Sequence, residues 1–146
     1  MGVKGWTADD LGQATVELAV AFPVALVVAV IAVNAMLFFS DCASFDRVAR
    51  EMVRIHATSP AYGQQIEQSK AKIEDGLAAT FNRSNLSSRV SVEAVDGGHV
   101  RFSATLEYAP TLFGQGMRSS VLGVSLPHLE HTEQLTVDCY KPGMLL

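Results

Sequence analysis

The chain has 146 residues, of which 49% are hydrophobic, and a formal net charge of −4. This length suits one domain, and so high an apolar share need not all belong to a globular core. Lysine and arginine are scattered, without a basic stripe or interleaved aromatic residues, so we expect no nucleic-acid partner. The sequence holds no glycine-rich phosphate loop and no Gly-x-Ser-x-Gly turn, so we expect neither an enzyme nor a bound cofactor.

The first twelve residues, MGVKGWTADDLG, form a mainly polar segment that lacks apolar periodicity and is expected to add nothing to a core. The 22 residues from Leu18 to Phe39 then carry no charge and are interrupted only by Pro23 and Asn34. A helix of that length spans roughly 30 Å, which is the thickness of the hydrocarbon layer of a bilayer. The sequence therefore predicts one membrane-spanning helix that contacts lipid through residues 18–39.

The helix is expected to continue beyond the membrane as an amphipathic rod, because apolar residues follow at 3-4-3 spacing. These are Phe45, Val48, Met52 and Ile55. Charged residues take the opposite face, namely Arg47, Arg50, Glu51 and Arg54. Ser59-Pro60 should end the helix, since the residue before a proline disfavours helical geometry.

A second helix is predicted over residues 64–81, with Ile66, Ile73, Leu77 and Phe81 on its inward side. Strict alternation then predicts a hairpin, with strands over 90–94 and 100–108 and a turn at Asp96-Gly97-Gly98. A short strand over 121–126 and a last strand over 133–140 complete the pattern. The predicted fold class is α+β: a long membrane-spanning helix, a second helix and a small antiparallel sheet of three or four strands.

The two cysteines, Cys42 and Cys139, lie just after the span and near the C-terminus. A disulfide between them would suit a domain outside the cytoplasm, and two unpaired buried thiols are the alternative. The cluster His128-Leu129-Glu130-His131 is the one stretch with two nearby histidines, but it lacks a helix or a further ligand, so we expect no metal site.

Three interpretations of the N-terminal region compete. A cleavable secretory signal could be cut after Val33-Asn34-Ala35, although the apolar run continues through Phe39. A plain signal anchor would explain the span. It would explain neither Glu17, a carboxylate at the edge of an apolar run that tolerates charge poorly, nor the glycine five residues before it.

The third interpretation comes from a resemblance. Gly12-Gln13-Ala14-Thr15-Val16-Glu17, followed by an apolar run with Pro23, resembles the N-terminus of TadE-like pilins of the tight-adherence (Flp, type IVc) pilus systems. Members of this family have a short leader that ends in glycine and a glutamate as the fifth residue of the mature chain. Glu17 is the fifth residue counted from Gln13, and Ala49-Arg50-Glu51 with Arg54 resembles the polar segment that follows the span in the family.

The resemblance implies a leader at 1–12, a transmembrane and assembly helix at 13–58, and a soluble α+β pilin-like domain at 59–146. A prepilin peptidase would cut between Gly12 and Gln13. The chain would be a minor pilin or pilin-like subunit, with other pilin subunits and the assembly platform in the membrane as partners. Its C-terminal domain would be extracytoplasmic, at the cell surface or in a pilus. The alternative is a signal-anchored extracytoplasmic binding or receptor domain that does not assemble.

Charges flanking the span give a different indication of orientation. Lys4 and the N-terminal amine precede the span, whereas Arg47, Arg50 and Arg54 follow it. The positive-inside rule would therefore place the C-terminal domain in the cytoplasm. We follow the leader motif, which implies the opposite orientation.

The residues also imply a mechanism. Removal of the leader would create an ammonium group on Gln13, about 6 Å along the helix axis from Glu17. In a bundle of like helices Glu17 would be buried and would need a cationic partner, and the ammonium of a neighbouring subunit could be that partner. Cyclisation of the N-terminal Gln13 would remove the charge. Pro23 would loosen or kink the helix, because it cannot donate to the carbonyl of Ala19.

Overall fold

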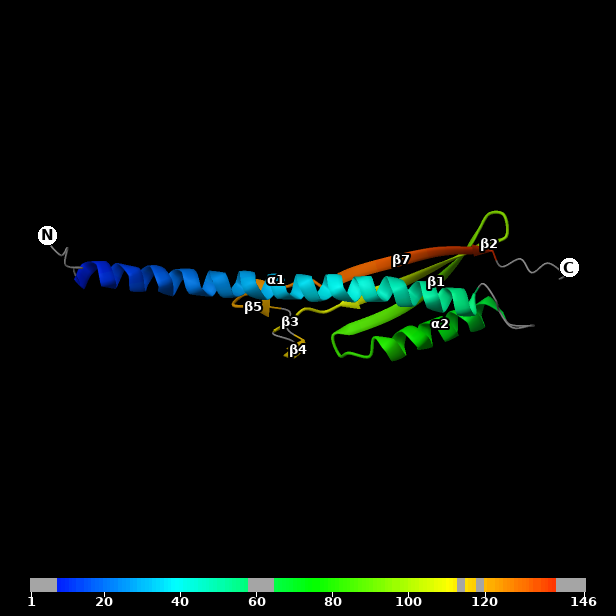
Figure 1. Ribbon diagram of the computed structural model, residues 1–146, viewed down its shortest axis with the longest axis horizontal. Helices are drawn as coiled ribbons and strands as arrows, with labels where there is room; N and C mark the ends of the chain where they lie inside the picture. Colours follow the sequence, from blue (N-terminus) through cyan, green and yellow to red (C-terminus); the bar gives the residue numbers. More distant parts are fainter. Residues whose placement is uncertain (1–7, 58–64, 113–114, 118–119, 139–146) are drawn as a thin grey trace, which may run out of the picture.

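The computed structural model describes residues 8–57, 65–112, 115–117 and 120–138. Figure 1 shows a long helix, α1 (Ala8–His56), whose C-terminal half lies along a second helix, α2 (Ile66–Thr80), and an antiparallel sheet. The N-terminal part of α1 projects alone from this assembly. The predicted α+β fold, with a long apolar N-terminal helix, a second helix and a three-stranded sheet, is confirmed.

Helix α1 is 49 residues long and has Pro23 inside it. Within the part of the chain that the structure describes, it is the one helix long and apolar enough to cross a membrane. It begins at Ala8, before the predicted first mature residue Gln13, and ends at His56, three residues before Ser59. The expectation of one helix that runs from the apolar segment into the soluble domain is therefore confirmed.

The buried face of α1 differs from the predicted one. Phe45, Ala49 and Val53 are at most 1% exposed, whereas Ile55 is 50% exposed. Val48 and Met52 flank the buried stripe and pack against it. These three buried residues are spaced four apart and so lie in one row along the helix, which the sheet and α2 cover. Alanine contributes little to an apolar pattern, so Ala49 concealed this row in the sequence.

Helix α2 lies within the predicted range of 64–81. Ile73 and Leu77 are fully buried as expected, but Ile66 is 42% exposed and Ser69 takes the inward position one turn later. Gly76 faces α1: a Cβ atom there would lie 2.8 Å from the sulfur of Met52. The missing side chain therefore allows the two helices to approach closely.

The sheet has the strand order β1-β2-β7, with all neighbours antiparallel. Its strands are β1 (Leu86–Val95), β2 (His99–Tyr108) and β7 (Leu129–Asp138). Gly97 and Gly98 have φ values of 84° and 81°, so the turn between β1 and β2 uses the backbone freedom of glycine, as the sequence predicts. Strand β7 begins four residues before the predicted start at 133.

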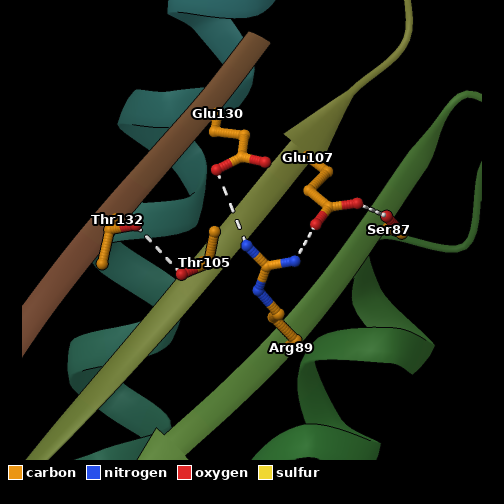
Figure 2. Close-up of polar contacts among 6 residues, drawn as sticks. All are labelled: Ser87, Arg89, Thr105, Glu107, Glu130 and Thr132. Carbon is orange, nitrogen blue, oxygen red and sulfur yellow. Dashed lines mark hydrogen bonds and ion pairs between the residues drawn. The ribbon is translucent and has the colours of Figure 1, made fainter. Parts of the chain in front are cut away.

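One face of the sheet packs on the helices and the other is polar. The buried face of β2 presents Val100, Phe102, Ala104, Leu106 and Tyr108. On the opposite face Arg89 of β1 forms ion pairs with Glu107 of the adjacent strand β2 and with Glu130 of β7, the strand beyond it (Figure 2). The hydroxyls of Thr105 and Thr132 lie 2.9 Å apart. This face is satisfied by polar contacts, so the fold has two layers and needs no third.

Between β2 and β7 the chain forms two small antiparallel ladders in place of the single strand predicted over 121–126. One pairs β3 (Thr111–Leu112) with β4 (Gln115–Met117), and the other pairs β5 (Ser120–Val121) with β6 (Val124–Ser125). We call the described residues from 111 to 126 the shoulder. Leu112 and Leu126 of the shoulder pack with Leu26, Val27 and Val30 of α1. The soluble domain therefore covers part of the predicted span.

Asn34 joins the shoulder to α1 and is only 5% exposed. Its Nδ2 donates to the carbonyls of Val30 and Thr111, both at 2.9 Å. Its Oδ1 accepts from the backbone N–H of Thr111 and from the hydroxyl of Tyr108, also at 2.9 Å each. Both donors and both lone pairs of the amide are used, so a polar residue inside the apolar run is fully satisfied by the fold.

We expect Asn34→Ala to lower the free energy of unfolding by about 3 kcal/mol, because it leaves buried groups of Thr111 and Tyr108 without partners. Urea unfolding in detergent, followed by near-UV circular dichroism, measures the change. Val33→Ala is the matched control, since Val33 lies one residue away and is 40% exposed. Equal stability of the two variants would contradict the role given to Asn34.

Candidate functional site: the uncovered end of the N-terminal helix

The N-terminal end of α1, from Gly12 to Ala25, is exposed on every side. Its large apolar side chains are between 62% and 69% exposed; they are Val16, Leu18, Val20, Phe22 and Val24. A soluble protein rarely leaves so continuous an apolar surface in water, and such surfaces mark contacts with a membrane or with another protein. We call this segment the uncovered end.

Glu17 is the sole charged residue of the uncovered end. Its Oε1 accepts a hydrogen bond from Nε2 of Gln13, one helical turn earlier, at 3.1 Å. It borders an apolar strip formed by Val16, Val20, Ala21, Val24 and Ala25. A carboxylate has about four acceptor positions, so Glu17 can still accept hydrogen bonds from a cationic group and pair with it.

The predicted cleavage bond, between Gly12 and Gln13, lies inside α1. Little more than one helical turn, Ala8–Gly12, precedes it. The first four N–H groups of a helix have no intrahelical partner, so this turn is weakly held and can open locally. A Cβ atom at Gly12 would meet no atom within 4 Å, so the bond lies in an open region of the surface.

Pro23 is a further residue that the sequence singles out. The helix continues on both sides of it. Together with Val24, Val27 and Val28 it lines a shallow apolar groove whose other wall is Leu122 of the shoulder. Pro23 therefore lies where the uncovered end meets the first contact of the soluble domain.

Cys42 lies three residues beyond the predicted span and is partly buried. Burial raises the pKa of its thiol, and the negative charges of Asp46 and Asp41 raise it further. Cys139 lies outside the described residues, so its pairing with Cys42 stays a prediction. The last described residue of β7, Asp138, pairs with His99 at the turn end of the sheet.

A cluster of ionisable side chains that the sequence did not predict connects α1 to β7 through hydrogen bonds. His131 Nε2 lies 2.7 Å from Asp46 Oδ1, and Arg50 donates to Glu133 at 2.8 Å. Ligand atoms of Asp46, His131 and Glu133 lie within 4.8 Å of one another. These three could hold a cation if Arg50 released Glu133, whereas His128 takes no part in the group. The hydrogen bond between His131 and Asp46 and the ion pair between Arg50 and Glu133 explain the arrangement.

Asp41 is the first charged residue after the apolar run and is 9% exposed. Its Oδ1 forms an ion pair with Arg83, while its Oδ2 is buried with no hydrogen-bond partner among the described residues. The same charge, after burial, contributes to raising the pKa of Tyr108. The position of Asp41 at the end of the run was the one sequence signal that could have identified it.

Comparison of the chain with protein-family models, with curated proteins and with solved structures gave no match. The features of the chain that bear on its function are therefore the uncovered end, Glu17 and the attachment of the soluble domain to the same helix.

We expect Cys42 to be alkylated by iodoacetamide more slowly than free cysteine at pH 8, in a Cys139→Ser variant. A raised pKa means a smaller fraction of thiolate at that pH, and the thiolate is the species that reacts. The rate should rise as the pH is increased beyond 8. Mass spectrometry of the labelled peptide measures the rate, and labelling as fast as that of free cysteine would contradict the assignment.

Proposed function

We propose that this chain is a minor pilin or pilin-like subunit of a tight-adherence (Flp, type IVc) pilus, resembling the TadE-like proteins. A prepilin peptidase would process it after Gly12, and it would join the pilus through the uncovered end of α1. The observation that carries the proposal is an exposed carboxylate, Glu17, on an apolar helix end that no other described segment covers.

The proposed assembly depends on where Glu17 lies before and after it leaves the membrane. In the bilayer it can remain near the headgroups. In a bundle of helices it would be surrounded by apolar strips such as Val20 and Val24, where an unpaired carboxylate is costly. The ammonium on Gln13 of a neighbouring subunit would neutralise it and would set the axial register of the two chains.

This pairing would also distinguish processed from unprocessed subunits. A chain that keeps residues 1–12 has a peptide bond at Gln13 in place of the ammonium. Within one subunit the side chain of Gln13 already donates to Glu17, so the carboxylate is oriented along the helix before assembly. The remaining acceptor positions stay available to the neighbour.

The attachment of the soluble domain suits a helical bundle. The apolar cluster that joins the shoulder to α1 begins at Leu26, and the preceding residues 12–25 are exposed. An exposed face of α1 carries Arg47, Arg50, Glu51 and Arg54. A subunit of this shape can bury its uncovered end among like helices while the polar part remains in water.

A second candidate function is a signal-anchored extracytoplasmic binding or receptor domain. One observation favours it: α1 begins at Ala8 and is continuous across the bond between Gly12 and Gln13. A plain anchor would keep this helix intact. The two functions differ in the N-terminus of the mature protein.

We expect the mature chain to begin at Gln13. N-terminal sequencing and intact mass of protein extracted from membranes of a host with a tight-adherence system would measure this. If Gln13 has cyclised, Edman sequencing is blocked and the mass is lower by one ammonia. A chain that retains Met1 would favour the receptor function, and one that begins near Met36 would indicate a secretory signal.

We expect Glu17→Gln to yield a stable, membrane-inserted and processed subunit whose incorporation into pili falls by about tenfold or more. The substitution keeps the size and a hydrogen-bonding group but removes the charge that pairs with the ammonium. The ammonium would then be buried without a counter-charge, which costs several kcal/mol. Immunoblots of sheared pili, compared with the membrane fraction, measure incorporation.

Glu51→Gln is the matched control, because Glu51 is exposed on the same helix within the soluble domain. It should assemble as the unmodified chain does. Incorporation of the Glu17→Gln chain at the level of the Glu51→Gln chain would show that the ion pair is not needed.

A further inference from the structure

The tip of the β5–β6 hairpin has an unusual residue for its backbone. Leu122 and Gly123 connect the two strands, with φ values of 49° and 82°. Positive φ at both central residues defines a type I′ turn, whose first position strongly favours asparagine, aspartate or glycine. A leucine in the left-handed region costs about 1 to 2 kcal/mol. The turn itself therefore gives no reason for Leu122.

Packing gives no reason either, because Leu122 is 67% exposed. Its apolar surface faces a groove shared with Pro23, Val27 and Val28 of α1. A side chain that is unfavourable both for its turn and for contact with water indicates a contact that the isolated chain does not make.

The level of Leu122 along α1 identifies that contact. The groove lies between six and eleven residues after Glu17, which is about 9 to 17 Å along the helix axis. The apolar cluster between the shoulder and α1 begins at Leu26. From Leu18 to Ala25 the uncovered helix is only about 12 Å long, whereas the hydrocarbon layer is about 30 Å thick. The uncovered turns alone therefore cannot cross the bilayer.

We propose that the tip of the shoulder is a lipid contact: Leu122 inserts among the acyl chains of the bilayer, which also occupy the groove beside Pro23, Val27 and Val28. The inference rests on α1 as a membrane anchor and holds whether or not the subunit assembles into a pilus. The groove is continuous with the exposed apolar surface of the uncovered end, so one lipid phase covers both.

The polar groups of the shoulder limit how deep it lies. Asn34 satisfies the N–H and C=O of Thr111, and the two ladders pair further backbone groups. Both ladders are two-stranded and keep open edges, which the hydrocarbon core does not tolerate. The body of the shoulder therefore lies near the headgroups at the level of Asn34, about 26 Å along α1 from Glu17, and only its apolar tip reaches the acyl chains.

Tryptophan probes in the full chain test this arrangement. Trp6, the one tryptophan of the sequence, is first changed to Phe. Single probes are then introduced as Leu122→Trp, Val20→Trp and Asp96→Trp. Val20 lies in the uncovered end, and Asp96 lies in the β1–β2 turn at the far end of the molecule (Figure 1). Fluorescence is compared in phosphatidylcholine vesicles with and without brominated acyl chains.

We expect the bromolipid to quench Val20→Trp and Leu122→Trp by at least about half, and Asp96→Trp by less than a tenth. Quenching of Val20→Trp with none of Leu122→Trp would overturn the lipid contact and leave the anchor intact. No quenching of either would overturn both. Emission of Leu122→Trp that resists bromolipid but shifts to the blue as protein concentration rises would overturn the proposal in favour of a second copy in the groove.

A smaller probe covers the case in which Leu122→Trp does not fold. Leu122→Cys with a nitroxide label, in a chain with Cys42→Ser and Cys139→Ser, reports depth by collision with oxygen against a water-soluble nickel chelate. We expect collisions with oxygen to dominate, as they would for Val20→Cys. Dominant collisions with the nickel chelate would overturn the proposal.

Discussion

The side-chain amide of Asn34 is the interaction on which the rest of the structure depends. It pairs with both backbone groups of Thr111 and with the hydroxyl of Tyr108, and so links the apolar part of α1 to the shoulder and to the end of β2. Thr111 and Tyr108 are both buried, so leaving their polar groups without a hydrogen bond to the amide would lower the stability of the fold. One polar residue thereby determines how far along α1 the soluble domain extends.

Polar contacts between side chains hold the soluble domain in the same position along α1, nearer to the C-terminal end of the helix. Arg83 pairs with Asp41, His131 with Asp46, and Glu133 with Arg50. Two of these partners come from β7, so α1 and β7 share a fixed axial register. The apolar core of Phe45, Ala49 and Val53 supplies the larger stabilisation, because partly exposed ion pairs contribute little. The pairs select one alignment among those that the apolar core would allow.

This attachment divides α1 into parts with different surroundings. Up to Ala25 the helix is free, and from Leu26 onward it carries protein on one side. The free part holds Glu17 and suits insertion or bundling, whereas the outer face of the sheet is polar and suits water (Figure 2). The proposed subunit and the proposed lipid contact at Leu122 both follow from the boundary between these parts.

The sequence by itself determined the elements whose signal is local: the uncharged run from Leu18 to Phe39, the β1–β2 hairpin with its glycine turn, and the position of Glu17. Only the tertiary structure decided which polar residues face one another. Asp46 and Arg50 have the i, i+4 spacing of a pair within a helix, yet each bonds to β7. Asn34 interrupts the run in sequence but is satisfied 77 positions away, because a hydrogen bond depends on distance in space, which periodicity does not encode.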